Sequence, residues 1–352
     1  MEDPTISVLA PPDDHGGIGR YAEQLRTRIA DTVDTTHIPL YEVLGVVGYV
    51  QAALRATNSD VVHVQFEYGL FRPKLLYTWV FFPVLFLSAK PRDIPVVVTV
   101  HEVWILDVVG RVQYVYVWLV HLLLAITATR LVFMTEATES DFQPQNIVET
   151  ERIPHGVNMD GVQDIEFEKA RSSFGYDSDD TVISQIGYVS PRKGTKDFLS
   201  LADNYPQYKF LLAGGALRDE DEQYFDEAVE MAPENVHATG VLSDGVFHAS
   251  FVATDVAILA YHDIRQSGIL NWCFAYGVPV VCRAIGRFEA LAERGAPLVL
   301  FDESKFYPSI DEAVDTALTE AADRAKSMQA FGTKRNFTRV ASQYIDIYRS
   351  LI

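Results

Sequence analysis

The sequence has few cysteines, few lysines and no apolar run long enough to cross a membrane. Its two cysteines, Cys273 and Cys282, lie in apolar surroundings and support neither a disulfide framework nor a zinc site. The longest apolar tracts, residues 75–87 and 112–127, fall short of the roughly 18 residues of a spanning helix. No basic region followed by an apolar stretch opens the chain. We therefore expect a cytoplasmic protein, either free or at the cytoplasmic face of a membrane.

Positive charge is also scarce. The chain has 29 Lys and Arg against 48 Asp and Glu, a net charge of −19 at pH 7. Nucleic-acid binding depends on cations that neutralise phosphates, so this balance argues against a nucleic-acid partner. Only 9 of the 29 basic residues are lysines. An acidic surface with few lysines is typical of proteins kept soluble in high salt, which favours a halophilic source over the alternative of an ordinary acidic protein.

Strand-length apolar runs alternate with helix-length segments along all 352 residues, a pattern that predicts the α/β class with parallel sheets. The length suits two domains. We expect strands at 6–9, 36–40, 61–64, 96–100 and 131–134, and again at 182–186, 210–213, 236–238, 256–259, 278–282 and 298–301. The acidic stretch 158–178 lacks an apolar period and is expected to be a linker. The spacing of Val340, Tyr344, Ile347 and Tyr348 predicts an amphipathic C-terminal helix.

Three turns are candidate anion sites because each opens a predicted helix, where backbone N–H groups and the helix dipole favour negative charge. Gly16-Gly17 follows the first strand, and Ser267-Gly268 opens the helix within 265–281. Arg192-Lys193-Gly194 follows the first strand of the second half. Two cations oppose the dipole at a helix N-terminus, and a bound anion would remove that conflict. Each turn taken alone also fits a packing turn or a solvated surface turn.

The motifs, taken in order, resemble those of the GT-B glycosyltransferases, specifically the retaining group called family 4. The resemblance covers essentially the whole chain and is carried by GGIGRYAEQL (16–25), VVTVHEVW (97–104), RIPHGVN (152–158), IGYVSPRKG (186–194), KFLLAGG (209–215), ATGVLSD (238–244), QSGILNWCFAYGVPVV (266–281) and FTRVASQYIDIYRSL (337–351). It implies two doubly wound Rossmann-like domains facing a cleft. Residues 1–158 would bind the acceptor and residues 176–336 the nucleotide-sugar donor. The helix 337–352 would return to complete the first domain.

The same resemblance implies a hexosyltransferase that moves a sugar from a nucleotide-sugar donor to a saccharide or lipid-linked glycan. Retention, and no metal or other cofactor, are expected; the acidic turns at 177–180 and 219–222 fit solvated or capping charge. The residues that match the family are placed as follows: Lys193 with Arg192 on the leaving diphosphate, His101 beside the transferred sugar, Ser267 and Gly268 on the distal phosphate, Gly16 and Gly17 on the diphosphate or an acceptor group, and Leu242 in the base-contacting loop.

Two departures from the family concern the donor site. Tyr188 follows Gly187 where an arginine is usual, and Arg192 is expected to substitute for that arginine. The two family glutamates, eight residues apart, fall on Ile264 and Trp272. Asn271 could hydrogen-bond to the ribose in place of the second glutamate, or Trp272 could stack on it. Two alternatives stay open: a catalytically weak GT-B subunit that binds a partner, which the missing glutamates favour, and another GT-B enzyme such as a nucleotide-sugar epimerase.

Two further segments allow more than one interpretation. His63, Gln65 and Glu67 run off the third strand and fit either sugar binding or hydrogen bonds within a loop. The tracts 73–88 and 112–127 are rich in aromatic residues, including Trp79 and Tyr116. They fit peripheral contact with a membrane, but packing against the sheet is favoured because apolar stripes normally mark a core.

Overall fold

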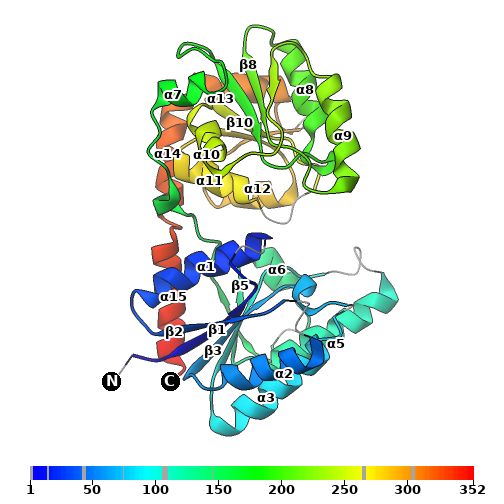
Figure 1. Cartoon of the computed structure of the whole chain (residues 1–352), viewed down its shortest axis with the longest axis vertical. Helices are drawn as coiled ribbons and strands as arrows, with labels where there is room; N and C mark the ends of the chain where they lie inside the picture. The colour runs from blue at the N-terminus through cyan, green and yellow to red at the C-terminus, as the bar shows by residue number, and fades with distance from the viewer. Residues whose placement is uncertain are drawn as a thin grey trace. The chain divides into compact units, whose positions relative to one another are not determined.

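A computed structural model describes residues 3–13, 16–41, 45–73, 75–104, 110–144, 146–263, 267–302 and 306–352. The chain divides into two compact units, shown in Figure 1. Unit 1 comprises Met1–Gly156 and Arg335–Ile352, and unit 2 comprises Val157–Lys334. Each unit is built on one parallel sheet of six strands. The α/β class with parallel sheets is therefore confirmed.

The sheet of unit 1 has the strand order β2-β1-β3-β4-β5-β6. Its strands are β1 (Ile6–Ala10), β2 (Thr35–Pro39), β3 (Val61–Phe66), β4 (Val96–Val100), β5 (Arg130–Phe133) and β6 (Glu149–Arg152). Figure 1 shows α1 (Gly16–Ala30) and α15 (Phe337–Ser350) on one face of this sheet. The other face carries α2 (Gly45–Ala56), α3 (Thr78–Ala89) and α5 (Arg111–Thr127). The central strands β1, β3 and β4 are buried along their whole length, as expected of parallel strands covered on both faces.

The C-terminal helix α15 belongs to unit 1, as predicted. Its apolar stripe packs with α1 and with side chains of β1 in one core, and Tyr344 and Tyr348 are fully buried there. Phe337, at the start of α15, lies so close to Gly156 that a Cβ on Gly156 would approach its ring to 2.7 Å. The glycine of the segment 152–158 is thus required by packing inside unit 1.

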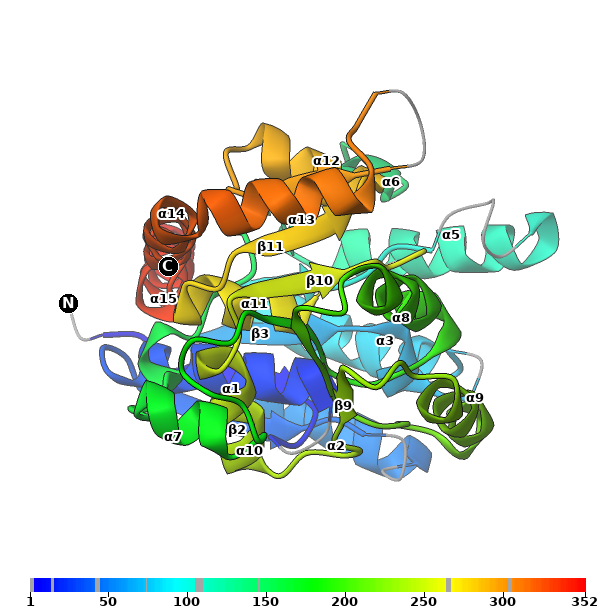
Figure 2. The same ribbon diagram turned by 90° about the horizontal axis from the view of Figure 1, so that it is seen from above.

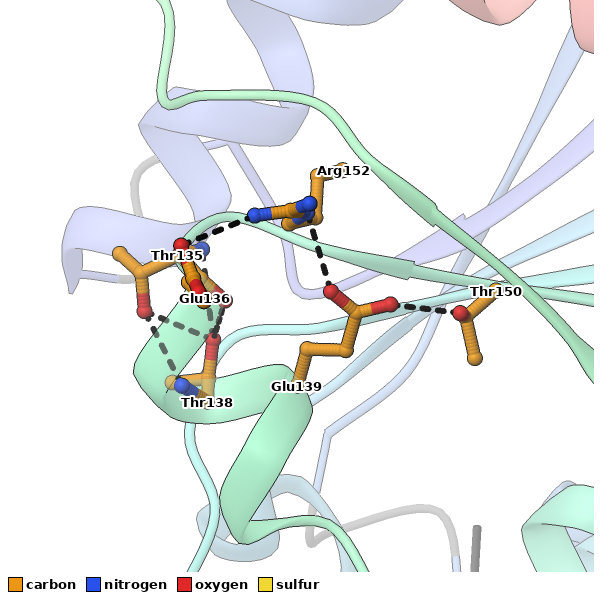
Figure 3. A network of polar contacts seen from close by, with 6 residues as sticks. All are labelled: Thr135, Glu136, Thr138, Glu139, Thr150 and Arg152. Carbon is orange, nitrogen blue, oxygen red and sulfur yellow. Dashed lines mark hydrogen bonds and ion pairs between the residues drawn. The ribbon is translucent and has the colours of Figure 1, made fainter. Parts of the chain in front are cut away.

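Strand β6 was not predicted because its sequence, ETER, has no apolar residue. It is an edge strand held by charge: Arg130 of β5 pairs with Glu149 and Glu151 across the ladder. Figure 3 shows its other attachment, in which Arg152 pairs with Glu136 and Glu139 of α6 (Glu136–Asp141). Charged edge strands resist pairing with other chains.

The sheet of unit 2 has the order β12-β11-β10-β7-β8-β9. Its strands are β7 (Val182–Ile186), β8 (Lys209–Ala213), β9 (Val236–Ala238), β10 (Val256–Leu259), β11 (Val280–Arg283) and β12 (Val299–Phe301). The helices α8 (Thr195–Asn204), α9 (Asp219–Glu230) and α13 (Ile310–Thr319) share one core, and Figure 2 shows α13 running over β10 and β11. The second core contains α7 (Phe167–Ser172), α10 (Asp244–Val252), α11 (Gly268–Tyr276), α12 (Gly286–Glu293) and α14 (Ala321–Thr333).

The stretch 158–178, expected to be a linker, is part of unit 2. It contains α7, and Phe174 and Tyr176 enter the core. Arg171 is 1% exposed and its guanidinium lies 2.8 Å from the carboxylate of Asp255, just before β10. The apolar period was hidden because so few residues of this segment are apolar and a charged side chain supplies the central contact.

Both sheets reverse their strand order at one point, where doubly wound sheets bind ligands at the carboxyl ends of the strands. This point lies between β1 and β3 in unit 1, and between β7 and β10 in unit 2. The glycines after β1, the basic turn after β7 and the Ser-Gly turn after β10 all follow strands that flank these points. The sheet topology therefore predicts ligand binding at the same turns as the sequence motifs do.

Candidate functional site

The basic turn of unit 2 is fixed tightly against the end of β10. Gly194 has φ +67, and a Cβ there would come within 2.0 Å of the carbonyl oxygen of Ala260. The backbone N–H of His262 donates to the Arg192 carbonyl at 2.9 Å, which ties the loop after β10 to the turn. Gln185 of β7 donates its side-chain N–H to the Lys193 carbonyl at 3.2 Å. These three contacts fix the backbone of the turn, and therefore the positions from which the side chains of Arg192 and Lys193 extend.

Lys193 stands over an aromatic ring. Its Nζ lies 3.8 Å from the centroid of the Tyr261 ring, and Tyr261 is 1% exposed. Burial, and to a smaller degree the positive charge of Arg192, lower the pKa of Lys193 to about 8. Among the described residues no carboxylate pairs with Lys193 or with the exposed Arg192. Two adjacent cations, one of them half-buried, are left for an anion from outside the chain.

A second polar group, the Tyr261 hydroxyl, is buried beside this cation. No hydrogen bond of good geometry joins it to a described residue, although the Ser267 side chain lies close to it. Burial raises the pKa of Tyr261, while the nearby Ser267 side chain lowers it to a smaller extent. A buried hydroxyl without a partner is costly unless a ligand satisfies it.

Helix α11 begins next to Tyr261. The Ser267 hydroxyl accepts a hydrogen bond from the Leu270 N–H at 3.1 Å and so caps the helix. A Cβ added to Gly268 would meet nothing within 4 Å, so packing does not require glycine at that position. The first N–H groups of α11 have no partner within the helix, and its dipole favours an anion there.

The remaining donor-site candidates lie in unit 2 and differ in their exposure. Tyr188 is 45% exposed directly after β7, and Leu242 is half-buried against the core. Asn271 is half-buried on α11. Trp272 packs with its ring 4.9 Å from that of His248 of α10, in T-shaped geometry, and against Gly161. Trp272 therefore serves the packing of α10 on α11; Ile264 lies outside the described residues.

In unit 1, His101 follows β4 and is 6% exposed. Its Nε2 lies 2.7 Å from Gln65 Oε1, and its ring meets that of Tyr21 of α1 edge-on at 5.1 Å. Burial lowers the pKa of His101 to about 3, with smaller contributions from His155 and His63. At neutral pH His101 is thus an uncharged imidazole, suited to hydrogen bonding rather than to donating a proton as an acid.

The partners of His101 fix which ring nitrogen carries its proton. With its amide nitrogen toward His63, Gln65 donates to His63 Nε2 at 3.1 Å, and the Thr99 hydroxyl donates to the same nitrogen at 2.8 Å. In this arrangement the proton of His63 resides on Nδ1 and is donated to the Tyr348 hydroxyl at 2.7 Å. The Gln65 carbonyl oxygen then accepts from His101 Nε2–H, which leaves His101 Nδ1 as an acceptor. His63 and Gln65 are fully buried, so they orient His101 and do not face a ligand themselves.

The glycine loop of unit 1 lies at the start of α1. Helix α1 begins at Gly16, and a Cβ added to Gly17 would meet nothing within 4 Å. Tyr21, one turn further along α1, contacts both His101 and His155. His155 donates its Nδ1–H to the Gly156 carbonyl at 2.7 Å, in keeping with a role in closing the segment. Gly17, which has free space beside it, and His101 thus lie near the same end of the unit 1 sheet, linked through Tyr21.

Sequence reasoning missed two members of these sites. Tyr261 reads as one more core aromatic, and only the fold shows its ring beneath Lys193. The relay of Gln65, His63 and Tyr348 joins residues that are up to 285 positions apart in the chain. The period-2 placement of His63 and Gln65 in an otherwise apolar strand was the available signal. No group of three or more potential ligands is arranged to hold a metal ion within the described parts of the chain.

No protein-family model matches this chain. The alpha-galactosylglucosyldiacylglycerol synthase of Streptococcus pneumoniae (strain ATCC BAA-255 / R6) is 26% identical over 149 residues, which are 40% of this chain and 39% of that protein. The chain thus matches well under half the length of this relative.

Solved structures match over nearly the whole chain. HepE from Anabaena, determined in complex with UDP and glucose, has a TM-score of 0.72 at 16% identity and covers 99% of this chain and 100% of its own. Sucrose-phosphate synthase from Thermosynechococcus elongatus has a TM-score of 0.69 at 16% identity, covering 99% and 98%. Because these matches cover 99% of this chain, they include both six-stranded sheets and the C-terminal helix α15. The chain therefore has the GT-B fold of two Rossmann-like units.

Proposed function

We propose that this protein is a glycosyltransferase that moves a sugar from a nucleotide-sugar donor to a saccharide or lipid-linked glycan acceptor. The observation that carries the proposal is the half-buried cation of Lys193 over Tyr261, beside the N-terminus of α11, where no described carboxylate neutralises it. Breaking a sugar–diphosphate bond places negative charge on the leaving group, and fixed cations and amides stabilise that charge.

Each unit has a separate part in this proposal. Unit 2 binds the donor, with Lys193 and Arg192 on the diphosphate, Ser267 and Gly268 on the distal phosphate, and Leu242 in the loop for the base. Unit 1 binds the acceptor, and His101 supplies a neutral acceptor nitrogen to a sugar hydroxyl. The reaction proceeds with retention, as the resemblance to family 4 implies, and these cations do the work of a metal.

The acceptor is the less constrained half of the proposal. The S. pneumoniae relative is by name a glycolipid synthase, and HepE was determined with UDP and glucose. We propose a UDP-hexose donor and a glycosyl lipid as the first pair to try, together with peripheral contact of the enzyme with a membrane. In the described residues no helix has the length and apolar character needed to cross a bilayer.

The test is release of nucleoside diphosphate from a panel of nucleotide sugars, with and without a glycosyldiacylglycerol in micelles. We expect one donor to be consumed, faster with acceptor, and to raise the thermal midpoint: at 100 times its Kd it adds roughly 2.7 kcal/mol of stability. If every donor stays intact and none shifts the midpoint, the proposal fails.

A binding subunit without turnover is the second candidate. It is favoured by Trp272, which packs against α10 where the family glutamate would hold the ribose. This candidate predicts a donor that shifts the thermal midpoint but is never hydrolysed or transferred. The same panel therefore separates the two functions.

A further inference from the structure

One face of unit 1 exposes an unusual amount of apolar surface. The helices α2, α3 and α5 lie side by side on that face of the sheet (Figure 1), and α3 contacts both of the others. Ten of the 21 large apolar side chains that are exposed in the described residues lie on these helices or directly before α3. They include Val47 at 68%, Leu87 at 70% and Val112 at 89% exposure. Exposed apolar side chains concentrated on neighbouring helices in this way indicate an interaction site rather than ordinary scatter.

Helix α5 carries two apolar stripes, one buried and one exposed. Its buried stripe, with Val117, Val120 and Leu124, packs on the sheet. A second apolar stripe, formed by Val112, Val115, Leu119 and Ile126, repeats at helical spacing on the exposed side. A surface helix of a water-soluble protein normally carries polar residues there. The exposed side of α5 is therefore suited to contact with an apolar partner or solvent.

The charge of this surface is the reverse of the rest of the chain. Residues 45–56, 72–92 and 110–129 contain no Asp or Glu, although the chain has 48. Basic side chains instead stand exposed at the helix ends, namely Arg55, Arg72, Lys90, Arg92 and Arg111. Arg92 donates to the Thr57 hydroxyl at 2.9 Å, which places Arg92 beside the C-terminal end of α2. An apolar stripe bordered by cations suits an anionic, partly apolar partner.

The aromatic residues on the surface point to a lipid interface in particular. The indole N–H of Trp79 on α3 donates to the Tyr116 hydroxyl on α5 at 3.0 Å, and both rings are at least partly exposed. Amphipathic rings of this kind concentrate at the boundary between headgroups and acyl chains. A second copy of the chain fits less well, because a two-fold interface would bring these cations against their own copies.

We infer that the outer face of α2, α3 and α5 docks unit 1 on the surface of an anionic lipid bilayer. The apolar side chains enter the acyl boundary, and Arg55, Lys90, Arg92 and Arg111 reach the lipid phosphates. Docking stands on the surface alone; its purpose, to bring unit 1 to a lipid-linked acceptor, rests on the proposed transferase function.

The experiment is sedimentation of the full chain with vesicles of phosphatidylcholine, pure or mixed with phosphatidylglycerol. We expect the wild type to bind the mixed vesicles and to bind pure phosphatidylcholine much more weakly, since cations contribute to the attraction. Leu87→Asp/Val112→Asp should lower the partition constant at least about tenfold, because it removes two apolar contacts and adds repulsion. Val229→Asp/Met231→Asp, on exposed apolar side chains of unit 2, should bind as the wild type does.

Lys90→Glu/Arg111→Glu provides a second test that spares the apolar contacts, and it should weaken binding to mixed vesicles only. The inference is overturned if the wild type ignores both vesicles, or if Leu87→Asp/Val112→Asp still binds the mixed ones. A dimer in gel filtration that this variant dissociates would also overturn it, in favour of a second copy. Thermal melts check that each variant folds.

Failure of the transferase function would look different. Vesicle binding needs no donor, so Lys193→Met should still sediment with mixed vesicles. Leu87→Asp/Val112→Asp should in turn hydrolyse the donor in solution at the wild-type rate. Vesicle binding without any donor turnover would refute the proposed function and leave the docking surface in place.

Discussion

Replacing Lys193 with methionine tests the donor site, because it should lower kcat/KM without lowering the stability of the fold. Methionine keeps the apolar stem over the Tyr261 ring and removes the charge. Removing one preorganised donor to a developing anion typically costs about 2.7–4 kcal/mol of barrier, so kcat/KM should fall by roughly 10²–10³. A cation that merely solvates a surface turn would show no such loss.

Stability should behave differently, because burial penalises this charge. The pKa of Lys193 falls from 10.5 to about 8, a penalty of about 3 kcal/mol on the protonated form. Below pH 8 the whole penalty is present. Between pH 8 and 10.5 the folded state binds fewer protons than the unfolded state, so the contribution of this group to stability rises with pH. The lost contact with Tyr261 offsets about 0.5–2 kcal/mol of the gain.

We therefore expect Lys193→Met to be at least as stable as the wild type at pH 7, and the difference to shrink toward pH 10. Urea unfolding at both pH values measures this, and nucleoside diphosphate release measures turnover. Lys196→Met is the matched control, since Lys196 is exposed and lies in the next helix, 5.7 Å from the Tyr224 ring. A variant that turns over normally, or that is destabilised by more than about 1 kcal/mol at pH 7, would refute the reasoning.

Four further substitutions test other parts of the account. Gly268→Ala should leave the thermal midpoint unchanged but weaken donor binding at least about tenfold in calorimetry. Gly194→Ala should instead lower the thermal midpoint, because Gly194 has a φ of +67 and a Cβ there would clash with Ala260. Equal loss of donor binding and of thermal midpoint in the two variants would contradict the donor site. Tyr348→Phe leaves the buried His63 Nδ1–H unpaired and should lower the free energy of unfolding by about 1–3 kcal/mol, a loss that urea titration would detect. Arg171→Met should cost about 3 kcal/mol by the same method, and no change would show that this buried ion pair does not hold the segment 158–178.

The sequence predicted what depends on local pattern. The runs that became β3, β4 and β10 are largely apolar, and α15 follows its helical period, so local pattern alone was enough to place these elements. Strand β6 and helix α7 could not be placed in this way, because charge pairs between distant residues hold them rather than an apolar period. Motif order placed Lys193 and His101 at strand ends.

Motif order said nothing of the surroundings of these two residues. That Tyr261 lies beneath Lys193 follows from the pairing of β7 with β10, and a short sequence window does not contain that pairing. The fully buried chain from Gln65 to Tyr348 likewise needs α15 to return to unit 1. The polar residues of β3 therefore looked like ligand contacts in the sequence and proved to be the support of His101.

The most direct test of the central claim is a mass balance with a labelled sugar. The full chain is incubated with a nucleotide sugar and a glycosyl-lipid acceptor, and labelled glycoside and nucleoside diphosphate are quantified together. We predict that the two products form in equal amounts with the wild type and that both fall together in Lys193→Met. Donor that binds without forming either product, or glycoside that forms equally fast without the Lys193 charge, would contradict the account.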